Sequence, residues 1–427
     1  MSNASNDFMA RYEKLKSIFI NVIGRDEFKT RMMEYLKSLT KKKKLYRDCD
    51  DKLIMYISLS DAYFYNNIMF YDFNEGARII PLFTNLAKKV DLIFRIKNYE
   101  DKMRKICSKR CDNVDSIFFE LMVAIKYVEL GFDVEFLRET SSKSPDLKIV
   151  YDGVESFVEC KRLSRANSYA YEEIDRWYVI KEKIANAVKL KKISAEIHFE
   201  FKHELCRFSD KRIIEMVISI INSGTKKYWM LENEEIKITF SKIQSEKLAL
   251  DHAIHHSSPS LIHQLTGRYN PDFLYGAAMS GKGRFPYIED LDYASIISCD
   301  ANSEDSSEKK SQQVTHRLAK ASKQLKSKKT GFVHFMIEGC NGENTYKKLV
   351  EKNYSSVMNF EDRDGVFIAT YIHIIKYIVP IDQNFISEET VMYFAKNGFP
   401  PLPMRGCYYH YDETIRGHGT LYSDVRI

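Results

Sequence analysis

The segment SPDLKIVYDGVESFVECKRL, residues 144–163, constrains the fold of this chain more than any other stretch. Its central dipeptide, Asp152-Gly153, separates two runs in which apolar and polar residues alternate. Alternation with a period of two is typical of a strand with one buried face, and Asp-Gly is a preferred dipeptide for a two-residue hairpin turn. The sequence therefore predicts two antiparallel strands joined by a tight turn.

The expected pairing of these two strands brings three charged side chains together. If Tyr151 pairs with Val154, Asp146 stands opposite Glu159, with their Cβ atoms roughly 5 Å apart. Lys161 lies two residues beyond Glu159 and points to the same side. The opposite face carries mainly apolar residues, so we expect that face to pack on a core. The face with Asp146, Glu159 and Lys161 is expected to be solvated.

Two carboxylates held directly opposite one another destabilise a sheet unless another group compensates their charge. A divalent cation would compensate it well. Carboxylate oxygens suit Mg²⁺ or Mn²⁺, and Mg²⁺ usually takes one or two carboxylates together with waters and phosphate oxygens of a substrate. The alternative is an exposed hairpin on which Lys161 neutralises one of the acids.

The segment before the hairpin, DSIFFELMVAIKYVELGFDVEFL at residues 115–137, predicts a helix followed by a strand. Asp115 is the expected N-cap of this helix, and Gly131 is the expected stop. At about 100° per residue, Glu120 falls at the edge of the apolar stripe, towards the buried side. The residues that form this stripe are Ile117, Leu121, Ala124, Ile125 and Val128.

The order of these residues resembles the motif of the PD-(D/E)XK nuclease superfamily. Pro145-Asp146 is followed, after twelve residues, by Glu159-Cys160-Lys161. In that superfamily the motif lies on two adjacent antiparallel strands, and an acid on the preceding helix often joins the site, where Glu120 stands in this chain. The resemblance covers residues 115–163 and implies a restriction-endonuclease-like α/β fold, a mixed sheet flanked by helices.

The resemblance also implies a reaction and a cofactor. Asp146 and Glu159, helped by the backbone carbonyl of Cys160, would hold Mg²⁺, for which Mn²⁺ can substitute. Glu120 would be a further ligand, directly or through water. Lys161 would orient or activate the attacking water and offset the charge that develops on the phosphate. The expected reaction is hydrolysis of phosphodiester bonds, in DNA in preference to RNA, by an enzyme that acts as a homodimer.

Other functions stay open at this point. A restriction or phage-defence role rests on analogy at the level of the fold alone. An RNA-cutting effector that waits for an activating partner or ligand is one alternative to constitutive DNA cleavage. A non-catalytic module that binds nucleic acid or a partner protein, built on a nuclease-like fold, is another.

The composition narrows the class of protein. With 44% hydrophobic and 29% charged residues among 427, the chain is expected to be globular. Its eight cysteines include no C-x₂-C pair, which argues against a zinc ribbon or a disulfide framework and favours reduced thiols in the cytoplasm. No run of eighteen apolar residues predicts a membrane span. Basic runs at 41–44, 189–192 and 320–329 suit a polyanionic partner.

Two further motifs are discounted. The segment GAAMSGKG, residues 276–283, nearly matches a phosphate-binding P-loop, but Gly283 stands where Ser or Thr is needed, and no clear apolar strand precedes it. His252 and His256 have the spacing of a helical zinc pair, but the glutamate of a zinc-protease helix is missing between them.

The expected organisation has three parts: a helical N-terminal region at 5–105, a nuclease core at 106–339 with an insertion around 205–312, and an accessory C-terminal region at 340–427. Two helix–strand pairs compete to complete the sheet of the core. One follows Tyr171, and the other spans residues 314–339. The polar, low-complexity segment 299–313 is expected to be a mobile loop or linker.

Overall fold

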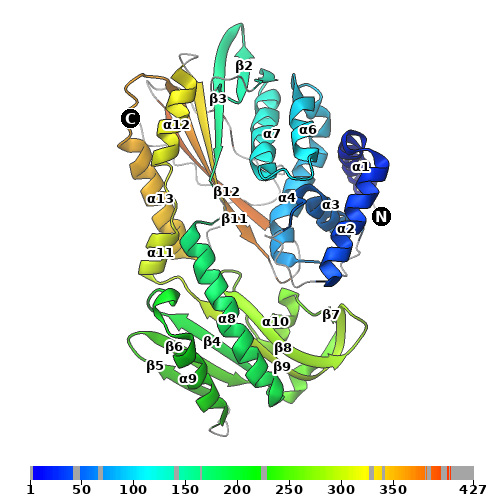
Figure 1. Cartoon of the computed structure of the whole chain (residues 1–427), viewed down its shortest axis with the longest axis vertical. Coiled ribbons are helices and arrows are strands. Elements are labelled where there is room, and N and C mark those ends of the chain that lie inside the picture. The colour runs from blue at the N-terminus through cyan, green and yellow to red at the C-terminus, as the bar shows by residue number, and fades with distance from the viewer. Residues whose placement is uncertain are drawn as a thin grey trace.

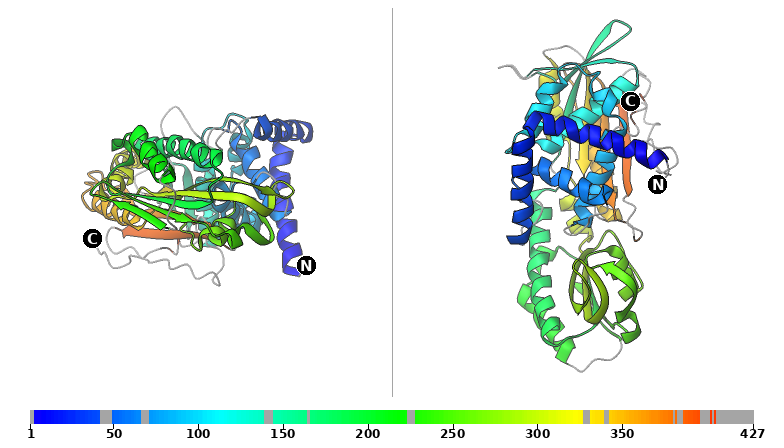
Figure 2. Two further views of the ribbon diagram at one scale, coloured as in Figure 1. Left: turned by 90° about the horizontal axis from the view of Figure 1, so that it is seen from below. Right: turned by 90° about the vertical axis from the view of Figure 1, so that its right-hand side faces the viewer.

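The computed structural model of the chain describes residues 3–41, 49–65, 71–138, 144–163, 166–222, 228–326, 331–338, 342–379, 381, 386–395, 402 and 404. It is a mixed α/β protein with two mixed sheets, which lie towards opposite ends of an elongated molecule (Figures 1 and 2). Within these ranges, no helix has the length and apolar character needed to cross a membrane.

The N-terminal region is helical, as expected. Its elements are α1 (Asn3–Ile23), α2 (Arg25–Lys41), α3 (Lys52–Phe64), α4 (Phe73–Lys88), α5 (Val90–Ile93) and α6 (Tyr99–Cys107). Large aromatic side chains such as Tyr12, Phe19 and Tyr56 are fully buried. They belong to one hydrophobic core that these helices share with the helix after them and with one face of the first sheet. The region therefore packs directly on the element that carries Glu120.

The predicted helix and strand that follow are confirmed. Helix α7 spans Val114–Glu129, Gly131 has a positive φ of 88° directly after it, and strand β1 spans Asp133–Phe136. The expectation that Asp115 is the N-cap of this helix is wrong, because Asn113 occupies the N-cap position and Asp115 lies in the first turn. Its side chain accepts hydrogen bonds from buried partners instead of capping the helix, as described with the site below.

The predicted hairpin is also confirmed. Strands β2 (Leu147–Tyr151) and β3 (Val154–Arg162) pair in an antiparallel ladder, with Tyr151 opposite Val154 as expected. Asp152 and Gly153 both have positive φ, 49° and 77°, which is the conformation of a type I′ turn and explains why this dipeptide stands there. The register expected from the sequence therefore holds throughout the ladder.

The first sheet has the order β1-β2-β3-β10-β11-β12. Its remaining elements are α12 (Thr315–Lys326), β10 (Gly331–Glu338), α13 (Glu343–Met358), β11 (Phe367–Ile378) and β12 (Ile386–Ala395). Strand β10 runs parallel to β3 and to β11, while β12 is antiparallel to β11. The later of the two competing helix–strand pairs, α12 and β10, thus completes the sheet. The sheet also continues into the stretch 367–395, which lies in the expected C-terminal region.

The second sheet has the order β5-β6-β4-β9-β7, and β8 pairs with β9. Its elements are α8 (Ser168–Leu190), β4 (Ala195–Phe201), η2 (Leu205–Arg207), α9 (Asp210–Asn222), β5 (Tyr228–Glu232), β6 (Ile236–Lys242), η3 (Ser245–Leu248), β7 (Ala249–His255), α10 (Pro259–Thr266), β8 (Leu274–Lys282) and β9 (Tyr287–Asp300). The helix–strand pair after Tyr171 belongs here, and the strands begin before residue 205. The P-loop-like segment lies mostly in strand β8, so it has no phosphate-cradling loop.

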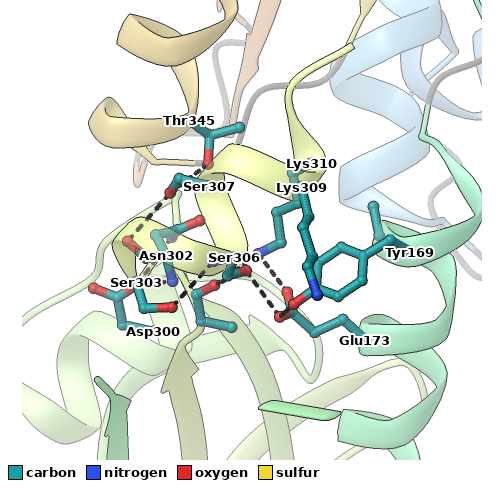
Figure 3. A network of polar contacts seen from close by, with 12 residues as sticks. Tyr169, Glu173, Asp300, Asn302, Ser303, Ser306, Ser307, Lys309, Lys310 and Thr345 are labelled. Atoms are coloured by element: carbon teal, nitrogen blue, oxygen red, sulfur yellow. Dashed lines mark hydrogen bonds and ion pairs between the residues drawn. The ribbon is translucent and has the colours of Figure 1, made fainter. Parts of the chain in front are cut away.

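The expectation of a mobile linker at 299–313 is wrong. This segment contains the end of β9 and helix α11 (Glu304–Lys310), and Ser306 and Ser307 are fully buried. Ser306 Oγ donates to Glu173 Oε1 of α8 at 2.9 Å, and Thr345 Oγ1 of α13 donates to Ser307 Oγ at 3.1 Å (Figure 3). Lys310 forms an ion pair with Glu173. This polar junction ties the second sheet to the first.

Candidate active site

Asp146 is held against strand β3 by backbone hydrogen bonds. The N–H of Asp146 donates to the carbonyl of Val158 at 3.1 Å, so Asp146 and Leu147, the ladder partner of Val158, both lie against that residue. The N–H of Cys160 donates in turn to Asp146 Oδ2 at 2.7 Å. Asp146 therefore contacts the residues on both sides of Glu159 in β3, and its carboxylate is fixed by a main-chain donor.

The expectation that this face of the hairpin is solvated is wrong. Glu159 has no exposed surface, and the side chain of Lys161 is 19% exposed. Strand β3 is an inner strand, because β10 pairs along its far edge. Helix α12 covers the face to which Glu159 points, because Phe157 on that face belongs to the same hydrophobic cluster as Leu318 of the helix. The acids thus lie in a largely enclosed site.

Glu159 and Lys161 form an ion pair through Glu159 Oε1. The other carboxylate oxygen, Glu159 Oε2, is buried and accepts no hydrogen bond from the part of the chain that the structure describes. A buried carboxylate oxygen that has lost its water without gaining a partner is unfavourable. This oxygen is therefore suited to a proton or to a cation from solution.

Glu120 reaches the same site from α7, with 13% of its side chain exposed. Its carboxylate pairs with Lys102 Nζ, and the ammonium of Lys102 also lies 5.2 Å from the ring centroid of Phe136 on β1. Lys102 was not predicted from the sequence. The signal that could have found it is its position near the apolar residues Met103 and Ile106, with which it shares the buried face of α6. A lysine on a short charged helix is normally solvated.

The acids interact electrostatically as one cluster. Burial, and then the charge of Asp146, raises the pKa of Glu159 to about 8. The same two causes raise the pKa of Glu120 to about 7, and Lys102 opposes them. Burial lowers the pKa of Lys102, but Glu120 and Asp146 outweigh it and hold the pKa above its usual value. The pKa of each of Glu159, Glu120 and Lys102 therefore depends on the charge of its neighbours in the site.

The donor set fits a divalent cation, although its side chains are not arranged around one. Among the described residues, no group of three His, Cys, Asp or Glu side chains gathers closely enough to hold a metal ion. Glu159 and Glu120 each engage a lysine instead. Carboxylate oxygens that repel one another, one of them without a hydrogen-bond partner, are nevertheless the ligands that Mg²⁺ and Mn²⁺ prefer.

A row of basic residues flanks the site on α12. Gln324 Nε2 donates to the carbonyl of Ser144 at 3.3 Å, which fixes the helix beside the segment that leads to Asp146. Lys320 and Arg317 precede Gln324 by about one and two helical turns, on the same side of the helix. Neither forms an ion pair within the described ranges. The end of the basic run, 327–329, lies outside the described residues.

A buried ion network anchors the end of β3. Arg162, which follows Lys161, donates to both carboxylate oxygens of Glu338 on β10 at 3.0 and 3.1 Å and lies 3.5 Å from Asp115. Arg78 of α4 donates to Asp115 at 2.8 Å. The network joins the N-terminal helices, α7 and two strands of the sheet. It holds the strand that carries Glu159 and Lys161 against the helix that carries Glu120.

No protein-family model, curated protein or solved structure matches the chain. The resemblance to PD-(D/E)XK nucleases therefore rests on the motif residues alone. The geometry of Asp146, Glu159, Lys161 and Glu120 is the basis on which a function is proposed below.

Proposed function

We propose that this protein is a divalent-metal-dependent nuclease that hydrolyses phosphodiester bonds, with DNA as its substrate and a restriction-endonuclease-like core. One observation carries the proposal. The N–H of Cys160 fixes Asp146 against β3 beside Glu159, and Lys161 contacts Glu159 in a largely enclosed site where the charges of Asp146 and of Glu120 on α7 both act on Glu159. A fold has no need of this combination for stability, because buried like charges destabilise it.

The residues that would hold Mg²⁺ or Mn²⁺ are Asp146, Glu159 and the backbone carbonyl of Cys160, with Glu120 as a further ligand. When bound, the metal would supply a more acidic water and positive charge to stabilise the phosphate in the transition state. Glu159 Oε2 supports this assignment, because it is a buried acceptor without a hydrogen-bond partner among the described residues.

Lys161 has a separate role in the proposed reaction. Its ammonium donates to Glu159 Oε1. In a site with little water, the electrostatic interactions of this charge are stronger than they would be on the surface. It would donate a hydrogen bond to the attacking water or to a phosphate oxygen and offset the negative charge that develops there. In the reaction the water oxygen forms a bond to phosphorus and loses a proton to solvent, while the bond from phosphorus to one ester oxygen breaks and that oxygen leaves as a hydroxyl after taking up a proton.

The basic row on α12 supports a polyanionic substrate. Arg317 and Lys320 lie on the helix that packs over β3, on the side of Gln324, which donates to Ser144 shortly before Asp146. A phosphate backbone that follows this row would lead towards Asp146. The preference for DNA over RNA comes from the resemblance, and the basic row would serve either polymer.

A non-catalytic binding module is the competing proposal. The burial of Glu159 argues against it, because a surface that only binds nucleic acid gains nothing from an enclosed acid with an unpartnered oxygen. The test is incubation of the purified protein with supercoiled plasmid, linear duplex, single-stranded DNA and RNA, each with Mg²⁺, Mn²⁺ or EDTA. Metal-dependent cutting of a DNA substrate supports the proposed nuclease. Cutting of RNA alone would identify RNA as the substrate in place of DNA. Binding without cutting of any polymer favours the binding module.

A further inference from the structure

Lys102 is the group through which the N-terminal helices reach the candidate active site. It lies on α6, and only 8% of its surface is exposed. Its Nζ pairs with Glu120 and lies 5.2 Å from the ring centroid of Phe136, so an anion and an aromatic ring both contact the charge. A lysine so deeply buried in a soluble protein requires a compensating charge, and Glu120 supplies it.

The two lysines of the site engage their acids differently. Lys161 contacts one oxygen of Glu159 and leaves the other, Oε2, without a hydrogen-bond partner in the described part of the chain. A cation could reach Glu159 Oε2 while that ion pair persists. Lys102 contacts the carboxylate of Glu120, and the charge of Asp146 also acts on it. Its ammonium therefore occupies the carboxylate that Glu120 would offer to a metal.

We propose that Lys102 is the resident counter-ion of the acid cluster, and that a divalent cation gains Glu120 as a ligand only by displacing the Lys102 ammonium. This inference rests on the proposed metal site and names a residue that limits metal binding there. The ammonium opposes the cation twice, by direct repulsion over a few ångströms and by occupying the Glu120 carboxylate. Because α6 belongs to the N-terminal region, the position of that helix determines how readily the metal binds.

The test measures Mn²⁺ binding by titration calorimetry, in the absence of nucleic acid, for the whole chain and its variants. Lys102→Met is expected to tighten Mn²⁺ binding by about tenfold or more, because one positive charge leaves a poorly solvated site. Lys102→Gln, which can still donate to Glu120 and perturbs packing less, is expected to shift the affinity in the same direction. Arg104→Met is the matched control, since it removes a cation from the exposed side of the same helix and should leave the affinity unchanged.

A double-mutant cycle separates displacement from general charge repulsion. In a Glu120→Gln background, Lys102→Met should lose most of its effect on Mn²⁺ affinity, because the two residues act through one contact. An unchanged or weaker affinity in both Lys102 variants, each confirmed as folded by circular dichroism, would overturn the inference while leaving the metal site standing. Absence of Mn²⁺ binding in wild type and in every variant would overturn the metal site and the inference together.

Discussion

Asp146 Oδ2 accepts a hydrogen bond from the backbone N–H of Cys160 across the hairpin, at 2.7 Å. This hydrogen bond joins the residue before β2 to β3, and it fixes the acid beside Glu159 without using another side chain. A carboxylate held by a main-chain donor has little rotational freedom. Metal sites with preorganised ligands lose less entropy on binding, so Asp146 is the residue on which metal affinity should depend most.

Asp146→Asn should weaken Mn²⁺ binding by about tenfold or more, because the amide oxygen still accepts from Cys160 but carries no charge. The fold should be retained for the same reason. Titration calorimetry measures the change. Asp152→Asn is the control, since it makes the same substitution in the turn of the same hairpin, where asparagine is equally suited to a positive φ. Equal affinities for the two variants would remove Asp146 from the ligand set.

Local sequence patterns were sufficient to predict the hairpin, its register and helix α7. Asp152-Gly153 determines the turn, and the period of two then sets every pair along the ladder. The position of Glu120 on the inner side of α7 follows from the helical period alone. The turn, the register and the buried face of α7 each depend on residues that are close together in the chain.

The burial of Glu159 could not be predicted in the same way. It depends on β10 and α12, which follow an entire second sheet in the chain, and no residue near Glu159 in the sequence indicates them. Lys102 was missed because its partner Glu120 lies on another helix. The serine-rich segment 299–313 has the composition of a linker, and only its contacts with Glu173 and Thr345 make it part of the folded junction. Each error involves a tertiary contact that composition does not encode.

The raised pKa of Glu159 predicts a pH dependence of stability in EDTA. Its ordinary value is 4.5, and in the fold it is about 8. Between these values the folded state keeps a proton that the unfolded chain has released, so the free energy of unfolding falls as pH rises through this window. Glu159→Gln does not titrate, so its Tm should fall less steeply than that of wild type between about pH 5 and 8. Scanning calorimetry gives both curves, and parallel curves would exclude Glu159 as the source.

The α12 row should contribute to nucleic-acid affinity by neutralising phosphates. Replacing Arg317 and Lys320 by alanine should weaken binding of a labelled DNA duplex in EDTA and reduce the slope of log K against log salt by about 0.9 for each phosphate that is no longer neutralised. Fluorescence anisotropy at several salt concentrations measures the slope. Replacing Arg25 and Lys29, two exposed cations of α2, is the matched control, because α2 and α12 lie on opposite sides of the view in Figure 1. The same slope in both double variants would place the binding surface elsewhere.

Arg162→Met should destabilise the sheet around the site, because it leaves the buried Glu338 carboxylate without its bidentate partner. Removing one member of a buried ion pair typically lowers the free energy of unfolding by about 3–5 kcal/mol. Hydrogen exchange followed by mass spectrometry should show faster exchange in α7 and β3. Arg363→Met removes an exposed arginine whose side chain is 85% accessible and should change exchange little. Unchanged protection of β3 in Arg162→Met would show that the network is dispensable.

The most direct test of the proposed function compares plasmid cleavage by wild type, Lys161→Met and Lys148→Met, each with Mg²⁺ and with EDTA. Lys148 lies on β2 of the same hairpin and pairs with Glu155, away from the acid cluster, so its variant controls for loss of a hairpin lysine. We expect wild type and Lys148→Met to cut with Mg²⁺ and not with EDTA, and Lys161→Met to be slower by about a hundredfold or more. Cutting by Lys161→Met at the wild-type rate, or cutting by wild type in EDTA, would contradict the proposed nuclease site.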